Sequence, residues 1–326
     1  MLNVAVVGCG LIGRKRASAL KGLVTLSACH DINPDVKMMF ANQFGCKAAD
    51  SVEEIFNDDQ IDVVFIATRH DSLASLARAA IIKRKSVFIE KPGAINSGEF
   101  RVLKDLSKNG DLKIHVGYNL RYHQGIARAL RIKEAGEIGK ILFLRARYGH
   151  GGRVGYNTEW RADKNLSGGG ELIDQGTHLL DLSLAFLGEV ELEFGATPNY
   201  FWEMPVEDNA FMIVKNEVGA IGFLHASCTE WKNTFSLEVY GERGKLEISG
   251  LGGSYGIERL THYKMSPEMG PPETQSWEYP MPDNSWRVEV EEFIRDVENG
   301  TFLSANYESS LRVLELVSTI YEVSGR

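Results

Sequence analysis

Residues 3–13, NVAVVGCGLIG, are the stretch that decides the fold. The apolar run Val4–Val7 is typical of a buried strand, and a Gly-x-Gly-x-x-Gly spacing follows it directly. In such a turn the first glycine makes the bend, the second lets a pyrophosphate approach the backbone, and the third lets helix and strand pack closely. The free N–H groups at the following helix start attract phosphate. The stretch therefore predicts a dinucleotide site, with a purely structural turn as the alternative; its residues are Gly8, Gly10, Leu11, Ile12 and Gly13.

The first part of the chain, residues 1–118, is expected to form a doubly wound parallel sheet of Rossmann type, in the α/β class. Short apolar runs alternate with helical patterns there, and strands without polar alternation are buried on both faces. Ser51 with Glu54 predicts a capping box, and Asn33-Pro34 predicts a helix start. The expected strands are Val4–Val7, Thr25–Cys29, Asp62–Ile66, Ser86–Ile89 and Lys113–Val116.

The second part, residues 119–326, is expected to be an α+β domain with a largely antiparallel, open-faced sheet. Several strands follow one another with tight turns such as 241–244, which favours antiparallel pairing. Its last helix is a candidate to pack back toward the first domain. The expected helices are His123–Glu134, Glu171–Phe186, Ser285–Glu298 and Ala305–Val323, and the expected strands are Ile141–Arg147, Asn209–Lys215, Gly219–Cys228, Thr234–Tyr240 and Lys245–Ile248.

Composition narrows the functional classes. The chain has 326 residues and a net charge of -8, which repels phosphate backbones and acidic membrane surfaces, so neither nucleic acid nor a membrane is expected as a partner. The four cysteines show no metal-ligand spacing, so no metal is expected and a reducing compartment is favoured. Glycines interrupt the first apolar run too early for a signal peptide or a membrane span. We therefore expect a cytoplasmic protein.

Asp31 lies 18 residues after Gly13, at the end of the expected second strand. An acidic side chain at this place accepts hydrogen bonds from the adenosine ribose diol and repels a 2′-phosphate. Neither Ile32 nor Asn33 is basic. The sequence therefore favours NAD over NADP; the alternative interpretation of Asp31 is a cap for the turn before Asn33-Pro34.

Two further segments carry groups suited to chemistry. Glu90-Lys91-Pro92 follows the fifth expected strand, at the sheet edge where ligands of such folds collect. Asp174 and His178 are four residues apart on an expected helix, and residues at this spacing share a face. The three glycines 168–170 before them would let a ligand approach the backbone. Taken singly, these residues are better explained as an exposed lysine at a strand end and a surface pair on a helix.

Together these motifs closely resemble the Gfo/Idh/MocA family of glucose-fructose oxidoreductase, inositol dehydrogenase and rhizopine catabolism. The resemblance extends over nearly the whole chain and also includes Gly117-Tyr118-Asn119-Leu120-Arg121-Tyr122. It implies that Lys91, Asp174 and His178 line the site of hydride transfer. It also implies that Asn119 and Arg121 lie close by, and that the C-terminal sheet forms a homodimer or homotetramer.

One loop departs from the family pattern. The family usually has Thr-Pro-Asn-x-x-His after the fourth strand, whereas this chain has Thr68 followed by Arg69, with Leu73 in the histidine position. Arg69 could contact the cofactor or a substrate anion, or be a solvated side chain. The full set of expected cofactor contacts outside the glycine loop is Asp31, Ala67, Thr68, Arg69, Glu90, Lys91 and Asn119.

The expected reaction is hydride transfer between NAD and a secondary alcohol or ketone of a sugar, inositol or nucleotide-sugar. An imidazole accepts a proton near neutral pH, so His178 is the expected base, while Lys91 stabilises the alkoxide and Asp174 binds a neighbouring hydroxyl or orients the imidazole. Two alternatives share the fold: an NAD-retaining glycosidase and a sensor that binds a dinucleotide without chemistry. Expected substrate contacts are Arg121, Tyr122, Trp160, Arg161, Asp174 and His178.

Overall fold

The computed structural model describes residues 1–106, 112–268, 270–302 and 306–325. Its contacts divide the chain into two compact units. The first contains Met1–Tyr118 and Trp286–Leu311, and the second contains Asn119–Ser285 and the segment from Arg312 onward. The expected domain division at residue 118 did not include Trp286–Leu311 in the first part.

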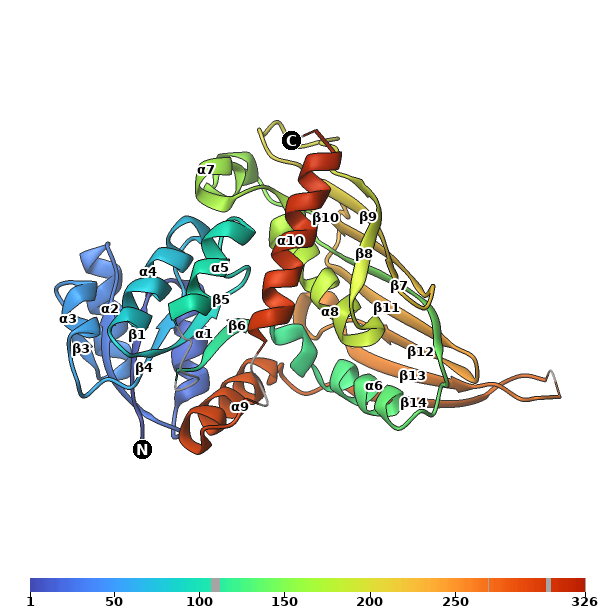
Figure 1. Cartoon of the computed structure of the whole chain (residues 1–326), viewed down its shortest axis with the longest axis horizontal. Coiled ribbons are helices and arrows are strands. Elements are labelled where there is room, and N and C mark those ends of the chain that lie inside the picture. Colours follow the sequence, from blue (N-terminus) through green and yellow to red (C-terminus); the bar gives the residue numbers. More distant parts are fainter. Residues whose placement is uncertain (107–111, 269, 303–305, 326) are drawn as a thin grey trace. The chain divides into compact units, whose positions relative to one another are not determined.

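The first unit is built on a six-stranded parallel sheet with the order β3-β2-β1-β4-β5-β6 (Figure 1, blue to teal). Its central strands are buried along their whole length, as continuous apolar runs require. The doubly wound fold predicted from the sequence is confirmed. The strands are β1 (Asn3–Val7), β2 (Thr25–His30), β3 (Lys47–Ala48), β4 (Val63–Ile66), β5 (Ser86–Glu90) and β6 (Ile114–Gly117).

Helices surround this sheet, and three of them share one hydrophobic core. Leu20 of α1, Phe40 of α2 and Phe293 of α9 pack with strand residues such as Val6 and Phe65 in that core. The segment from Trp286 belongs to this unit because the apolar side of α9 is buried there. The helices are α1 (Leu11–Leu20), α2 (Pro34–Phe44), α3 (Val52–Phe56), α4 (His70–Ile82), α5 (Ser97–Leu106) and α9 (Ser285–Asn299).

The second unit is built on an eight-stranded sheet with the order β14-β13-β12-β11-β7-β10-β9-β8 (Figure 1, green to orange). All neighbouring pairs are antiparallel except β7 with β10. This confirms the expected largely antiparallel sheet. The strands are β7 (Ile141–Gly149), β8 (Val190–Ala196), β9 (Asn209–Asn216), β10 (Ile221–Ser227), β11 (Thr234–Gly241), β12 (Gly244–Ser249), β13 (Glu258–Lys264) and β14 (Glu273–Tyr279).

Helices of the second unit contact its sheet, and outward-facing strand positions remain exposed. α8 is buried over most of its length and contacts β7, β8 and β10, while α6 contacts β12, β13 and β14. Exposed apolar residues on the strands include Leu142, Phe143, Phe194, Ile221 and Phe223. The remaining elements are the short helices Asn119–Tyr122, Tyr156–Thr158, Trp160–Ala162 and Gly253–Tyr255, with α6 (Gln124–Glu134), α7 (Lys164–Ser167), η4 (Leu172–Gly176), α8 (Thr177–Leu187) and α10 (Tyr307–Val323).

Three details differ from the sequence predictions. The helix expected over 171–186 begins with a π turn, η4, before α8 continues as an α-helix. The expected capping box is half formed: Ser51 accepts the Glu54 N–H, but the Glu54 carboxylate accepts the N–H of Asp50. Ala305, the expected start of the last helix, lies outside the described residues, and α10 begins at Tyr307.

Candidate functional site

The glycine loop of the first unit contains one position that is open and two that are closed. A Cβ on Gly8, which has φ +95°, would lie 2.5 Å from the carbonyl oxygen of Ala67, and a Cβ on Gly13 would lie 1.9 Å from that of Gly8. Among the described residues other than its chain neighbours, no atom lies within 4 Å of a Cβ built on Gly10. Gly8 and Gly13 are therefore required by the protein's own packing, whereas Gly10 leaves space for a ligand to approach the backbone.

The start of α1 provides the chemistry that a pyrophosphate needs. The helix begins at Leu11, and no side chain caps it at Gly10. The first N–H groups of a helix have no partner within it and carry partial positive charge. Leu11 is exposed, and Ile12 is the next residue of this first turn. The residues present thus fit a dinucleotide phosphate at the open side of Gly10.

Asp31 lies beside this loop. Its Oδ2 accepts the N–H of Cys9 at 2.8 Å, and its Oδ1 accepts the N–H of Asn33 at 2.9 Å. The second bond confirms the turn-capping role that was the alternative interpretation. Asn33 in turn caps α2 by accepting from Asp35 and Val36. A single carboxylate therefore joins the glycine loop to the end of β2, where an adenosine ribose is expected.

Several residues of the unusual loop after β4 pack against, or bond to, other parts of the protein. Ala67 packs against Gly8, and Thr68 accepts a hydrogen bond from Ser72 at 2.8 Å. Leu73, in the histidine position, has no exposed surface and belongs to the core. The Arg69 guanidinium pairs with Asp71 at 3.3 Å, with 46% of the side chain exposed. Arg69 is thus a partly exposed cation of this loop that is paired with Asp71.

β5 ends at Glu90, immediately before Lys91. The Glu90 carboxylate is buried and pairs with the Arg16 Nε at 2.5 Å, so it is engaged inside the first unit. Burial raises the pKa of Glu90, and Arg16 opposes that rise. Lys91 is partly buried. Glu90, an expected cofactor contact, is therefore bound to the protein itself in this structure.

Two expected ligand contacts at the start of the second unit are engaged in structural bonds. The Asn119 amide donates to the Ser285 hydroxyl at 3.0 Å. Arg121 forms a two-pronged ion pair with the buried Asp181 of α8, at 2.6 and 2.7 Å. Tyr122, which completes this short helix, is partly buried. These contacts connect the helix after residue 118 to the rest of the second unit.

Asp174 lies in the π turn that precedes α8. Its carboxylate is 6% exposed and accepts from the Arg161 Nε at 3.1 Å. The Arg161 guanidinium lies 4.6 Å from the centre of the Trp160 ring. Burial opposes the charge on Arg161, but Asp174 outweighs it and raises the Arg161 pKa. The structure thus brings three expected substrate contacts together: Trp160, Arg161 and Asp174.

His178 lies in the first turn of α8 and is 5% exposed. The His178 and Tyr148 rings form an edge-to-face contact, with 5.8 Å between ring centres and 74° between ring planes. Burial raises the pKa of Tyr148 well above its usual value, as do a hydrogen bond with Tyr255 and the charge of Asp174. A neutral phenol is therefore next to the imidazole.

The three glycines before Asp174 do not expose the backbone as the sequence predicted. A Cβ on Gly170 would lie 2.0 Å from the Glu207 carbonyl oxygen, and one on Gly169 would lie 1.8 Å from the Tyr321 hydroxyl. Gly168, at φ +83°, ends α7. The expectation that all three serve a ligand is wrong, because the protein's own atoms occupy the space beside Gly169 and Gly170.

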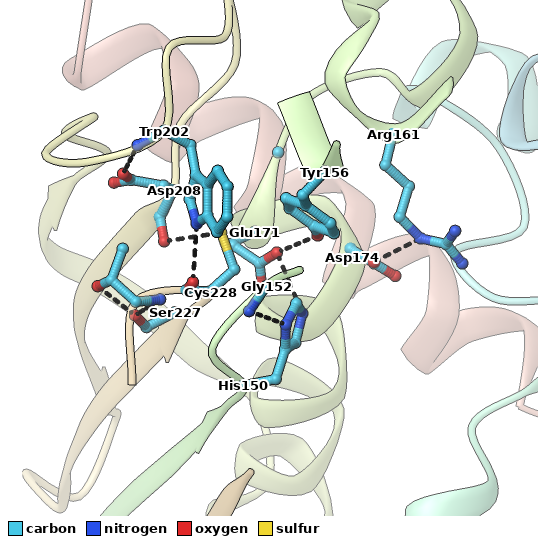
Figure 2. A network of polar contacts seen from close by, with 12 residues as sticks. His150, Gly152, Tyr156, Arg161, Glu171, Asp174, Trp202, Asp208, Ser227 and Cys228 are labelled. Carbon is cyan, nitrogen blue, oxygen red and sulfur yellow. Dashed lines mark hydrogen bonds and ion pairs between the residues drawn. The ribbon is translucent and has the colours of Figure 1, made fainter. Parts of the chain in front are cut away.

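Sequence reasoning missed a buried polar cluster beside Asp174. Glu171 is 1% exposed and accepts from the Tyr156 hydroxyl at 2.8 Å, and the His150 Nε2 lies 3.6 Å from the same oxygen. Figure 2 shows Tyr156 and His150 directed at Glu171, with Arg161 reaching Asp174. Burial lowers the pKa of His150, but Glu171 and then Asp174 outweigh it and raise that pKa. The available signal was the Gly-Gly-Gly-Glu order itself, which places a carboxylate in a tightly packed turn.

Within the described ranges, no group of His, Cys, Asp and Glu is arranged to hold a metal ion. Across those same ranges, none of the helices has the length and apolar content needed to cross a bilayer.

Comparisons with known proteins agree with this fold and glycine loop. Residues 2–118 match the family described as "Oxidoreductase family, NAD-binding Rossmann fold", and residues 126–247 match "GFO/IDH/MocA C-terminal domain". These matches define an NAD-binding oxidoreductase of the dehydrogenase class. The chain belongs to the GFO/IDH/MocA family, as the sequence motifs indicated.

Individual relatives share modest identity. The levoglucosan dehydrogenase of Pseudarthrobacter phenanthrenivorans is 25% identical over 283 residues, which are 75% of this chain and 73% of that protein. The inositol 2-dehydrogenase of Salmonella typhimurium is 30% identical over 154 residues, 45% of this chain and 46% of its own length. A structure of levoglucosan dehydrogenase in complex with NADH and L-sorbose matches with TM-score 0.90 and 21% identity, covering 100% and 97% of the two chains.

Proposed function

We propose that this protein uses NAD to oxidise a secondary alcohol of a sugar, inositol or nucleotide-sugar, or to reduce the corresponding ketone. The observation that carries the proposal is the open position at Gly10, where a helix start and the Asp31 carboxylate meet. Relatives named levoglucosan dehydrogenase and inositol 2-dehydrogenase support polyols as the substrate class.

The proposed reaction assigns a separate role to each named group. When bound, the nicotinamide supplies or accepts the hydride. His178 takes the hydroxyl proton, because an imidazole changes charge near neutral pH. Asp174 accepts a hydrogen bond from a neighbouring hydroxyl, and Arg161 holds that carboxylate in place. Lys91 stabilises the negative charge that develops on the substrate oxygen.

The preference for NAD over NADP rests on Asp31. Its carboxylate is held beside the glycine loop by the Cys9 N–H, where a 2′-phosphate would meet like charge. The levoglucosan dehydrogenase structure that matches this fold contains NADH. We therefore expect NAD to be the working cofactor.

The exposed surface and the cysteines support proposals for the assembly and the location of the protein. The exposed apolar residues on the eight-stranded sheet support a homodimer or homotetramer formed through that sheet. All four cysteines are free thiols, which supports a reducing compartment such as the cytoplasm.

The decisive experiment is a screen of inositols, sugars and nucleotide-sugars with NAD, followed by the NADH absorbance band. The proposal expects NADH to accumulate with at least one polyol, and Lys91→Met and His178→Ala to suppress it. Released sugar without NADH would indicate an NAD-retaining glycosidase. NAD binding with no turnover on any compound would indicate a sensor and contradict the proposal.

A further inference from the structure

A buried charge cluster in the first unit joins the helix of the glycine loop to β5, the strand that ends just before Lys91. Arg16 on α1 has no exposed surface, and its guanidinium pairs with Glu90 at 2.5 Å and with Glu289 of α9 at 2.6 Å. His115 on β6 lies 3.2 Å from the other Glu289 oxygen. The guanidinium therefore pairs with the end of β5 and with α9, and His115 of β6 joins the cluster through Glu289.

Aromatic rings and a glycine enclose the Arg16 side chain. Its guanidinium lies 4.3 Å from the centre of the Phe88 ring and 4.2 Å from that of Trp286. A Cβ on Gly117, the last residue of β6, would lie 2.5 Å from the Arg16 Nη2. Arg16 is thus enclosed by aromatic faces and by a glycine without room for a side chain.

The charges agree with this geometry. Burial opposes the charge on Arg16, but Glu90 and Glu289 outweigh it and raise its pKa. Burial also opposes the charge on Glu289, but Arg16 and then His115 outweigh it and lower that pKa. The guanidinium cation therefore lies between two carboxyl groups, and at Glu90 burial raises the pKa while Arg16 opposes that rise.

A buried ion cluster is rarely the most stabilising filling of a core, since apolar groups of the same volume often serve as well. What it does provide is a defined geometry, because moving either carboxylate away from the guanidinium leaves a buried charge uncompensated. Glu90 is the last residue of β5 and is bonded directly to Lys91. Any displacement of Glu90 therefore displaces Lys91.

From this arrangement we infer that Arg16 and Glu289 are positioning residues that hold Glu90 in place and so set the location of Lys91. The inference rests on the proposed function, in which Lys91 acts on the substrate oxygen. Because Arg16 belongs to α1, the same contact connects the helix of the glycine loop with the reacting group. Arg16 itself need not touch cofactor or substrate.

The test compares Arg16→Lys with Lys85→Met on the polyol that gives turnover. A lysine ammonium is a single point charge and cannot bridge two carboxylates as the guanidinium fork does. Since small misplacement of a reacting group costs up to about 100-fold in rate, we expect kcat to fall by about 10- to 100-fold in Arg16→Lys. The KM for NAD and the NADH affinity should stay near wild type.

Lys85 is the matched control. It is a buried cation that directly precedes the first residue of β5, and it donates to the carbonyls of Asp58 and Ile61. Lys85→Met should lower the Tm and leave kcat unchanged. A kcat for Arg16→Lys within twofold of wild type, with a lower Tm, would overturn the inference and leave Arg16 a purely structural residue.

If Arg16→Lys does not fold, Glu289→Gln tests the same point, because it keeps the volume and removes one charge that holds the guanidinium. A fall in kcat with unchanged KM for NAD is expected, and wild-type kcat would contradict the inference. Lys91→Met distinguishes the proposed role of Lys91 from the positioning role of Arg16. Full turnover in Lys91→Met would refute the proposed role of Lys91, whereas a dead Lys91→Met beside an active Arg16→Lys would refute only the positioning role.

Discussion

The two glycine-rich segments of this chain look alike in sequence but differ in the structure. In the loop Gly8–Gly13, one glycine faces open space and its neighbours are packed, so the backbone itself can meet a ligand. In 168–170 the space beside Gly169 and Gly170 is filled by Tyr321 and Glu207. The first segment therefore offers backbone to a cofactor, whereas the second shapes a turn that presents side chains.

If the turn formed by 168–170 acts only by presenting side chains, the His178 imidazole that follows it should have the largest effect on catalysis. General base catalysis is worth about 10² to 10⁴ in rate, so His178→Ala should lower kcat by that factor. NADH affinity should be unchanged, because His178 is expected to act on the substrate hydroxyl and is not among the expected cofactor contacts. Steady-state kinetics and fluorescence titration with NADH measure the two effects. If kcat and NADH affinity fell by the same factor, His178 would also contact the cofactor, which would contradict a role in catalysis alone.

A methyl group at a packed glycine should damage folding. Gly170→Ala places a Cβ 2.0 Å from the Glu207 carbonyl oxygen, and such overpacking costs about 1–3 kcal/mol. Thermal unfolding should show a lower Tm, with NADH still bound by the folded fraction. A wild-type Tm would mean that this turn has more freedom than the packing indicates.

Gly10→Ala and Gly13→Ala form a matched pair within the first loop. The methyl of Gly10→Ala meets no atom of the described residues beyond its chain neighbours, so the Tm should be retained. NADH affinity should fall by about tenfold or more through the loss of charge-assisted bonds to phosphate. Gly13→Ala should unfold the loop because its Cβ would lie 1.9 Å from the Gly8 oxygen. Calorimetric titration and thermal melts distinguish them. Undiminished NADH binding by Gly10→Ala would count against this loop as the cofactor site.

Cofactor choice should follow the charge next to the open glycine. Asp31→Asn keeps an acceptor for the Cys9 N–H and removes the charge that opposes a 2′-phosphate. The ratio of NADPH to NADH affinity should rise by about tenfold, since like charges in contact cost more than about 1.4 kcal/mol. Competition titrations give this ratio directly. An unchanged ratio would remove Asp31 as the discriminating residue.

The smallest expected effect concerns pH. The folded-state pKa of Glu289 is lowered, so the stability it contributes is present above the unfolded carboxyl pKa of about 4.3 and is lost as the pH falls through the folded value. The difference in unfolding free energy between wild type and Glu289→Gln should therefore shrink as the pH falls into the acid range. Denaturant titrations over this range measure it. Gly170→Ala, which involves only uncharged packing, should show a pH-independent difference.

Much of the fold could be predicted because its signals are local. Continuous apolar runs such as Val63–Ile66 require burial on both faces, and a strand, a spaced glycine motif and a helix specify the first βαβ turn. Antiparallel pairing followed from the short turn at 241–244. The assignment of Trp286–Leu311 to the first unit could not be predicted, because it depends on a contact between residues far apart in the chain.

The site was less predictable for the same reason. The motifs named Asp174 and His178, but the Arg161 partner of Asp174 and the Tyr148 neighbour of His178 come from other elements. The role of the glycines 168–170 was misjudged because glycine is used both for ligand approach and for close packing, and only the position of Glu207 and Tyr321 distinguishes them. Arg16 gave no sequence signal, since a charged residue on a helix is normally solvated.

The central claim is that the open glycine loop binds the dinucleotide that does the chemistry in this protein. The most direct measurement is NADH titration of wild type and Gly10→Ala, after thermal melts have shown that the two have the same Tm. Turnover of both proteins on one polyol follows. The account predicts saturable NADH binding by the wild type, weaker binding by the variant, and a parallel loss of kcat/KM at limiting NAD. Equal NADH affinity in the two proteins, or a wild type that binds no nicotinamide dinucleotide, would contradict it.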